Sequence, residues 1–369
     1  MNLGTSQTVV VAMSDGVDSS TVAALLVERG YNVIGMMMRL WAESSDDDHA
    51  LKLDASAKFV SNRCCSPEAV ADARGVCQKL GIPFYLLNYE SDFKTHVVDY
   101  FLDGYAHGVT PNPCLQCNRQ IKFGTLLDKA RAFGADFLAT GHYARTRERA
   151  GKIELLRGVD PKKDQAYALS LLNQDQLAHV MFPLGELTKA ETRAMARRFD
   201  LRVAEKHESQ DLCFIADGDY RNFLRRHVSS ALVPGDIVDT RGNVLAHHQG
   251  LGLYTIGQRK GLNIAVGEPL YVIALDTTRN AVVVGTASEL GKRELIARDM
   301  NWISGESPRE EIRVTAKIRY RAMETSATVT ALDNAQARVV FDEPLRDITP
   351  GQAVVLYDGE VCLGGGTIR

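Results

Sequence analysis

The sequence predicts an α/β protein in which an N-terminal doubly wound parallel sheet is followed by a small β-rich central domain and a C-terminal antiparallel domain of β-barrel type. The first half alternates short apolar, β-branched runs with helical patterns, which is typical of parallel strands joined by helices. From about residue 212, Gly and Pro punctuate short strand patterns instead. The length of 369 residues also exceeds that of most single domains. We therefore expect domains at residues 1–211, 212–280 and 281–369.

The N-terminal elements follow one another in the order that a parallel sheet requires. The strands that we expect are residues 8–13, 32–38, 84–89 and 136–140. The helices that we expect begin near residues 19 and 67 and cover 91–105 and 123–133. In such folds, ligands bind where strands end at their carboxyl side. Segment 43–63, which is rich in Asp and Ser, is expected to be a mobile surface insertion.

Alternating apolar patterns in the last part of the chain predict an antiparallel sheet or small barrel. These runs are residues 314–320, 327–331, 337–341 and 353–357. If the strand that starts at residue 314 continues through residue 321, then Lys317, Arg319 and Arg321 share one of its faces.

Composition limits the classes of function and the setting of the protein. The formal net charge of -3 gives no global basic signature, so any nucleic acid must be bound by local patches. We find no signal-peptide pattern and no apolar run near the roughly 18 residues of a membrane span, so we expect a cytoplasmic protein without a membrane partner. The seven cysteines are an odd number, which argues against a structural disulfide framework.

The segment Ser14-Asp15-Gly16-Val17-Asp18-Ser19-Ser20 links the first strand to an apolar helix and is typical of an anion site. Backbone N–H groups and the positive end of the helix dipole are available at such a point. The segment has neither a Walker A motif nor G-x-G-x-x-G. It resembles the S-G-G-x-D-S loop of the PP-loop ATP pyrophosphatases, which transfer AMP from ATP. The alternative is an ordinary serine-rich helix start.

Asp15 departs from that loop pattern, which usually has glycine at this position. A carboxylate beside pyrophosphate is unfavourable unless it points away or helps to hold magnesium. The substitution therefore predicts weaker or altered ATP binding.

Two cysteines at C-x-x-C spacing, Cys114 and Cys117, follow a proline-stiffened stretch and precede a helix. Taken alone, the pair is compatible with a zinc site, a redox pair or a reactive thiolate. A second C-x-x-C is absent from the sequence, so a four-cysteine zinc site has little support, and we predict no dedicated metal ligands. Cys213 stands apart, in the segment S-Q-D-L-C-F. Cys64, Cys65, Cys77 and Cys362 lack a comparable motif and are interpreted as buried or incidental thiols.

An ordered set of motifs resembles the tRNA-specific 2-thiouridylases over almost the whole chain. After the phosphate loop come T-P-N-P-x-x-x-C-N (110–118), A-T-G-H-Y (139–143), K-D-Q (163–165), the Cys213 segment, G-Q-R-K-G-L (257–262), K-I-R-Y-R (317–321) and V-C-L-G-G-G (361–366). The first motif is common to many enzymes. The full ordered set is specific to this family.

The resemblance implies a tRNA uridine 2-sulfurtransferase. ATP, with Mg2+, would adenylate C2 of the wobble uridine at tRNA position 34, because the C2 oxygen is a poor leaving group. Cys213 would receive a persulfide from a sulfur-donor protein, a desulfurase or a relay protein, and Cys117 would be the nucleophile that helps to release its sulfur. A disulfide between Cys117 and Cys213 would then remain for reduction. AMP and pyrophosphate would be the other products.

Cys114 is the second departure, because the family usually has aspartate there. An alternative is therefore an iron-sulfur cluster, as in some related tRNA thiolases, held by Cys114, Cys117 and Cys213. A different PP-loop AMP-forming synthetase and a non-enzymatic RNA-binding or metal-binding module are further alternatives.

The resemblance also implies the remaining site residues. For ATP they are Ala12, Met13, Ser14, Asp15, Gly16, Val17, Asp18, Ser19, Met38 and Gly141. For the extruded target base they are Asn112, Pro113 and Cys114. For tRNA they are His142, Lys163, Asp164, Gln165, Arg319, Tyr320 and Gln352.

Overall fold

The computed structural model describes the chain except for residues 1–6, 44–65, 207–211, 216 and 265–266. It has two compact units: the first comprises Met1–Val98 and Gln116–Asp219, and the second comprises Asp99–Leu115 and Tyr220–Arg369. Nearly all of the predicted surface insertion at 43–63, together with Cys64 and Cys65, lies outside the described residues. The three predicted domain boundaries stay a prediction.

A five-stranded parallel sheet, in the order β3-β2-β1-β4-β7, forms the centre of the first unit. Its strands are β1 (Thr8–Met13), β2 (Asn32–Arg39), β3 (Phe84–Asn88), β4 (Phe137–Ala139) and β7 (Val180–Met181). Val9, Val10 and Val11 of β1 are fully buried, because helices cover both faces of the sheet. The predicted doubly wound α/β domain is confirmed.

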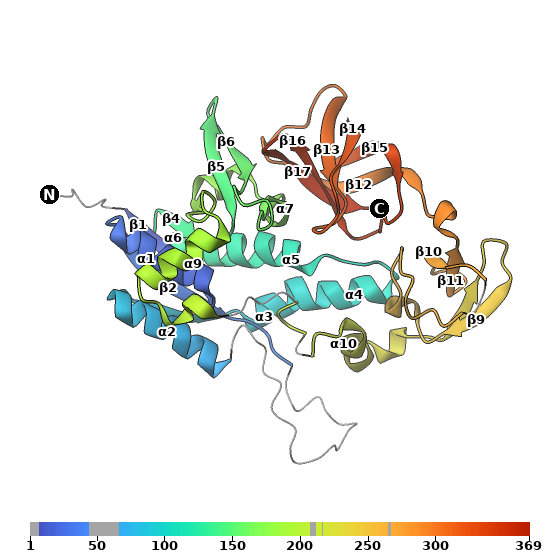
Figure 1. Ribbon diagram of the computed structural model, residues 1–369, viewed down its shortest axis with the longest axis horizontal. Helices are drawn as coiled ribbons and strands as arrows, with labels where there is room; N and C mark the ends of the chain where they lie inside the picture. Colours follow the sequence, from blue (N-terminus) through green and yellow to red (C-terminus); the bar gives the residue numbers. More distant parts are fainter. Residues whose placement is uncertain (1–6, 44–65, 207–211, 216, 265–266) are drawn as a thin grey trace, which may run out of the picture. The chain divides into compact units, whose positions relative to one another are not determined.

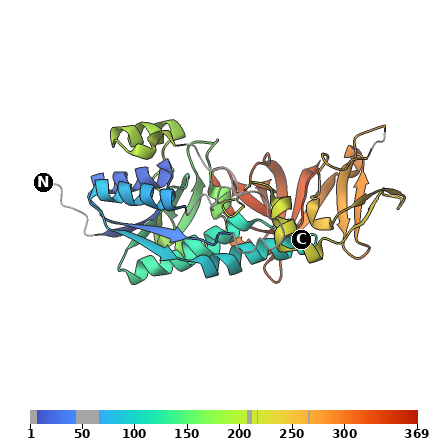
Figure 2. The same ribbon diagram turned by 90° about the horizontal axis from the view of Figure 1, so that it is seen from below.

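Helices α1 (Val17–Glu28) and α2 (Pro67–Leu80) lie on one face of the sheet and α6 (Leu127–Ala132) on the other (Figures 1 and 2). Helix α9 (Lys189–Arg198) packs beside α1 and begins with a capping box between Thr188 and Glu191.

The two longer predicted helices each contain a π-helical stretch. The first is divided into α3 (Glu90–Phe93), η2 (Lys94–Asp99) and α4 (Tyr100–Ala106). The second begins earlier than predicted, with α5 (Pro113–Gln116) and η3 (Cys117–Leu126) ahead of α6. π-Helical turns are rare in proteins, and those that occur are often found at functional sites.

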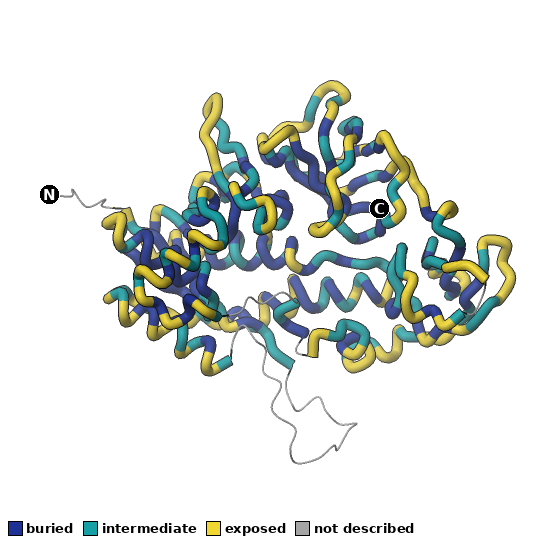
Figure 3. The backbone as a smooth tube through the Cα atoms, viewed as in Figure 1, coloured by how far each residue is buried: buried dark blue, intermediate teal, exposed yellow. Residues whose placement is uncertain are grey.

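The first unit also contains elements that the sequence patterns did not specify. They are the hairpin β5 (Ala144–Arg149) and β6 (Lys152–Arg157), the helices α7 (Ala166–Leu169) and α8 (Gln174–Ala178), and the 3-10 helix η4 (Arg202–Glu205). The tip of the hairpin is exposed (Figure 3), whereas Ala144, Leu155 and Leu156 at its base are buried.

The second unit begins its β-rich part with a four-stranded sheet in the order β10-β11-β8-β9. Its strands are β8 (Gly235–Val238), β9 (Val244–His248), β10 (Tyr271–Asp276) and β11 (Ala281–Gly285). Ile237, Val272 and Val282 form its core. Helix α10 (Tyr220–His227) precedes the sheet and was not predicted.

A closed antiparallel barrel completes the second unit. Its strands are β12 (Lys292–Trp302), β13 (Ile312–Lys317), β14 (Thr325–Leu332), β15 (Gln336–Leu345), β16 (Ala353–Asp358) and β17 (Val361–Ile368). They pair in the order β12-β15-β14-β13-β16-β17, and β12 also pairs with β17, which closes the barrel. Ala316, Val329 and Leu356 are among the buried residues that fill its interior. The predicted barrel is confirmed.

The expectation that Lys317, Arg319 and Arg321 share a strand face is wrong. Strand β13 ends at Lys317, and its last pairing with β14 is Ala316 to Thr325. The chain from residue 318 to 324 therefore forms the connection between the two strands, without the regular alternation of a strand. Throughout the described part of the chain, every helix is too short or too polar to cross a bilayer.

Candidate active site

The phosphate loop connects β1 to α1 at the carboxyl edge of the parallel sheet. The Ser14 backbone N–H donates to Ser19 Oγ at 3.0 Å, and the Gly16 N–H donates to Ser14 Oγ at 3.2 Å. The N-cap of α1 is Gly16, which has no side chain with which to cap the helix. The first-turn N–H groups of α1 are thus placed to bind an anion.

Asp18, in the first turn of α1, is neutralised by a lysine from α9. Lys189 Nζ lies 2.6 and 2.8 Å from the two carboxylate oxygens of Asp18, and the Tyr143 hydroxyl donates to Asp18 Oδ1 at 2.9 Å. The Lys189 side chain is only 12% exposed, so solvent screens this pair weakly. The pair links the phosphate loop to α9.

Asp15, the residue that departs from the usual loop pattern, also has a lysine partner. Lys206 Nζ lies 2.9 Å from Asp15 Oδ2 and 2.7 Å from Asp72 Oδ2 of α2. Partial burial lowers the pKa of Lys206, but its bonds to Asp72 and Asp15 outweigh that effect and raise the pKa above its ordinary value. Lys206 therefore stays charged at neutral pH.

Gly141 brings the end of β4 against the first turn of α1. A Cβ on Gly141 would lie 2.9 Å from Asp18 Cβ and 3.1 Å from Ser19 N, so only glycine permits this approach. Met38 lies near the end of β2 and is half-buried, whereas Met36 and Met37 are fully buried core residues. Gly141 thus lies against the phosphate loop, and Met38 is at the same edge of the sheet.

The cysteines differ in exposure. Cys117 is buried at the first residue of η3, Cys114 is exposed in α5, and Cys213 is half-buried. Cys77 and Cys362 are fully buried, as their lack of a motif suggested. Within the described residues, no three His, Cys, Asp or Glu side chains lie close enough together to bind a metal ion.

Asn118, next to Cys117, is a residue to which the sequence reasoning gave no role. Its side chain is only 4% exposed, and its Nδ2 donates to the Ala168 carbonyl of α7 at 2.9 Å. Its Oδ1 is buried without a hydrogen-bond partner. The bond holds η3, and therefore Cys117, to α7. The signal in the sequence was its place in the T-P-N-P-x-x-x-C-N motif.

The TPNP segment (residues 110–113), which carries Asn112 and Pro113, is fixed within the second unit by the turn before β16. The Thr110 N–H donates to the Pro350 carbonyl at 3.0 Å, and Gln352 Nε2 donates to the Thr110 carbonyl at 3.1 Å. The Leu115 N–H donates to Asn112 Oδ1 at 3.3 Å. Gln352, expected at the tRNA, thus binds the backbone of this segment.

His142 lies in the interior of the first unit. It is 8% exposed and packs between Phe123 and Phe182, and its Nδ1 is 2.7 Å from Thr140 Oγ1. Burial lowers its pKa well below the ordinary value, with a smaller contribution from the charge of Lys122. His142 is therefore neutral at pH 7.

Asp164 and Gln165 fix the turn that leads into α7. Asp164 Oδ1 accepts from the N–H groups of Gly158 and Ala166, each at 3.1 Å. Gln165 Oε1 accepts from the Tyr143 N–H at 2.9 Å. These side chains organise the backbone around the K-D-Q motif.

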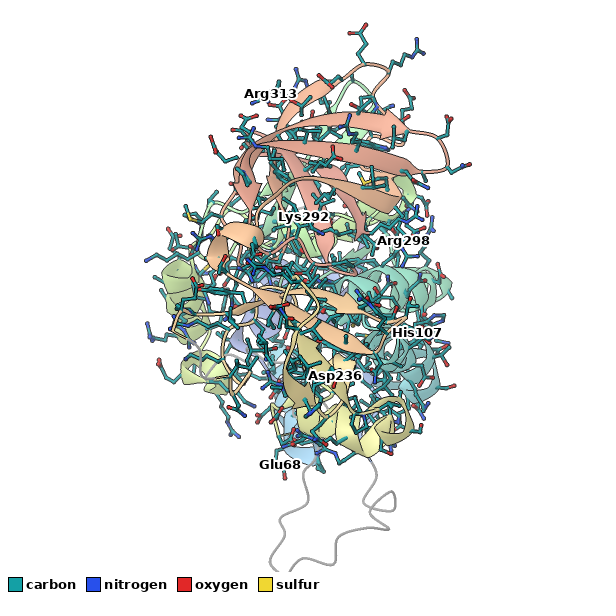
Figure 4. All side chains as sticks on the ribbon, turned by 90° about the vertical axis from the view of Figure 1, so that its right-hand side faces the viewer. Glu68, His107, Asp236, Lys292, Arg298 and Arg313 are labelled. Carbon is teal, nitrogen blue, oxygen red and sulfur yellow. The ribbon has the colours of Figure 1, made fainter. Side chains whose placement is uncertain are left out.

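The connection between β13 and β14 is largely exposed, and Arg319 within it and Lys317 just before it each have a carboxylate partner. Arg319 forms an ion pair with Asp347, and Lys317 Nζ lies 4.0 Å from Glu324 Oε1. Tyr320 is 43% exposed. Arg313, which is labelled in Figure 4, also lies on the barrel. It forms an ion pair with Asp342 at 2.7 Å.

Comparison with known proteins identifies the family. The model of the tRNA methyl transferase HUP domain matches residues 7–217, that of the tRNA methyl transferase PRC-barrel domain 221–286, and that of the aminomethyltransferase beta-barrel domain 292–368. The tRNA-specific 2-thiouridylase MnmA of Moorella thermoacetica is 53% identical over 98% of this chain and 99% of its own. The protein of the same name from Magnetococcus marinus is 52% identical over the same shares. The chain belongs to the tRNA-specific 2-thiouridylase family.

Membership of the 2-thiouridylase family explains the phosphate loop, because this family uses ATP through its PP-loop domain. Among solved structures, the U34-tRNA thiolase NcsA from Methanococcus maripaludis with its [4Fe-4S] cluster is 19% identical over 62% of this chain and 69% of its own, with a TM-score of 0.33. That likeness is too low to indicate a cofactor for this chain.

Proposed function

We propose that this protein is a tRNA uridine 2-sulfurtransferase that makes 2-thiouridine at the wobble position, uridine 34. The observation that carries the proposal is the identity of 53% and 52% to two 2-thiouridylases over 98% of the chain. The two cysteines of the family motifs, Cys117 and Cys213, are retained in this sequence.

The phosphate loop would bind ATP through backbone N–H groups from residue 12 to 19, with Gly141 and Met38 at the adenosine. Because Asp15 and Asp18 each have a lysine partner, neither carboxylate leaves an uncompensated charge beside the phosphates. Magnesium, when bound with ATP, would offset the remaining charge on the phosphates.

The first chemical step activates the base. The C2 oxygen of the uridine attacks the α-phosphate of ATP, and pyrophosphate leaves. Asn112, Pro113 and Cys114 would line the pocket of the extruded base. The bonds from Pro350 and Gln352 to Thr110 fix the chain segment that carries these residues, which supports a positioning role for the barrel.

Sulfur transfer then uses the two cysteines. The terminal sulfur of a Cys213 persulfide attacks C2, and AMP leaves. The Cys117 thiolate attacks the Cys213 sulfur, the sulfur-sulfur bond breaks, and its electron pair stays on the sulfur bound to C2. The resulting disulfide between Cys117 and Cys213 requires a thiol reductant before the next turnover.

The other proposed contacts are with partners. Arg319 and Tyr320 are exposed and suited to phosphate contact and stacking, and Lys163 lies in the same motif as Asp164 and Gln165. The burial of His142 favours a supporting role for that residue. A persulfide-carrying donor protein and a cytoplasmic location complete the proposal.

The cluster alternative is not favoured, because the full-length relatives at about half identity are 2-thiouridylases. A different AMP-forming synthetase leaves the match to the family's β-barrel model unexplained.

The test is anaerobic thiolation of unmodified tRNA with ATP, magnesium and a persulfide donor, with iron content recorded. Wild type is compared with Cys117→Ser, Cys213→Ser and Cys114→Ser, and Cys77→Ala is the control because Cys77 is a fully buried thiol that belongs to none of the sequence motifs. Loss of 2-thiouridine in the first two variants only, without iron, supports the persulfide route. Loss in all three with stoichiometric iron would indicate a cluster, and no thiolation by folded wild type would overturn the proposed function.

A further inference from the structure

The phosphate loop of this chain contains a carboxylate, Asp15, where the family pattern has glycine. Asp15 belongs to the loop itself, and its side chain is only 19% exposed. A unit charge in such a partly buried place repels bound phosphates more strongly than a charge in bulk water would. The loop therefore requires a compensating cation.

Lys206 meets that requirement and is itself held in place. Its Nζ bridges Asp15 at 2.9 Å and Asp72 at 2.7 Å. Its backbone carbonyl accepts from Arg193 NH2 at 3.1 Å, and Arg193 NH1 donates to the Ala204 carbonyl at 2.6 Å. Arg193 thus ties the chain segment that carries Lys206 to α9.

We infer that Lys206 is a positioning residue for ATP binding, which holds and neutralises the Asp15 carboxylate so that the loop accepts the phosphates. This inference rests on the proposed ATP-dependent function. It assigns to Lys206 an effect that acts through Asp15 and not through direct contact with the nucleotide. The role belongs to this chain because it depends on the aspartate in the loop.

A double-mutant cycle separates an effect through Asp15 from a direct one. The proteins are wild type, Lys206→Met, Asp15→Gly and the double variant, with Lys206→Arg as the conservative replacement. Lys79→Met is the matched control. Lys79 also belongs to the first unit, and it forms an ion pair with Asp200, an aspartate outside the phosphate loop. The readouts are the KM for ATP and the kcat of tRNA-dependent AMP release, with the melting temperature as a check of folding.

In the Asp15 background, Lys206→Met should raise the KM for ATP about tenfold with a smaller change in kcat, because the repulsion acts on bound phosphates. In the Asp15→Gly background the same replacement should change the KM by less than about threefold. Lys206→Arg should keep the KM within about threefold of wild type, because its charge is retained. Lys79→Met should have the wild-type KM.

Equal effects of Lys206→Met in both backgrounds would overturn the inference, because Lys206 would then act on the nucleotide or on the fold directly. An effect of Lys79→Met as large as that of Lys206→Met would overturn it as well. Failure of the proposed function is a different result, since wild type itself would then release no AMP with tRNA.

Discussion

Replacing Gly351 by alanine should slow thiolation by displacing the TPNP segment. Gly351 has φ +90°, a backbone conformation that side chains disfavour, and it precedes Gln352 in the turn that binds Thr110. A Cβ at this position would overlap Val109 Cγ1 and would lie 2.8 Å from the Thr110 carbonyl oxygen. The added methyl group therefore presses on the chain just before the proposed base-binding residues.

The left-handed conformation costs alanine about 1–2 kcal/mol, and overpacking adds about 1–3 kcal/mol. The chain can relieve most of this by moving residues 109–113 away from the turn, which breaks the hydrogen bonds to Thr110. Because a misplacement of about 1 Å can cost roughly 100-fold in rate, the single-turnover rate of 2-thiouridine formation should fall between about 10-fold and 100-fold. The assay uses saturating ATP and tRNA, so that the chemical step is measured.

Gly359→Ala is the matched control in the same barrel. Gly359 has φ +56° and open space around the position of a Cβ, so alanine there has the backbone cost without the overlap. We expect this control to lose some stability and to keep the wild-type rate. A folded Gly351→Ala variant with the wild-type rate, or equal loss of rate in both variants, would refute the reasoning.

Three further predictions concern the first unit. Lys189→Met should raise the KM for ATP about tenfold, because it leaves the Asp18 carboxylate without the Nζ at 2.6 Å, and steady-state AMP release measures it. Burial raises the pKa of Cys77 to about 11, so its thiol stays protonated at pH 8; mass spectrometry should find no alkylation of Cys77 in the native protein until the pH approaches that value. Asn118→Asp should lower the free energy of unfolding by at least about 2 kcal/mol in urea titrations, because a carboxylate oxygen would replace the donor to the Ala168 carbonyl.

The sequence alone was enough to predict those features that depend on a local pattern of residues. β1 has the predicted bounds because three consecutive buried valines make a continuous apolar run, which a strand covered on both faces requires. The phosphate loop was recognised for the same reason, since a strand, a serine- and glycine-containing loop and an apolar helix follow directly in the chain.

The structure was needed where a feature depends on residues far apart in the chain. Lys189 and Lys206 have no local motif that relates them to Asp18 and Asp15, and only the packing of α9 and the segment after it brings them to the loop. The prediction that the strand continues through residue 321 was wrong for a similar reason. Its alternating residues suit a strand, but the pairing with β14 ends at Ala316, and the chain must turn.

The same lysines change how the loop itself must be understood. Two carboxylates in one phosphate loop would weaken ATP binding if the loop were considered alone. With Lys189 on Asp18 and Lys206 on Asp15, the side chains of the loop are close to electrically balanced. Attraction for the phosphates then comes mainly from the uncapped N–H groups and dipole of α1, with magnesium bound to the nucleotide. The loop therefore binds an anion through its backbone, and its aspartates link it to α9 and to the segment that carries Lys206.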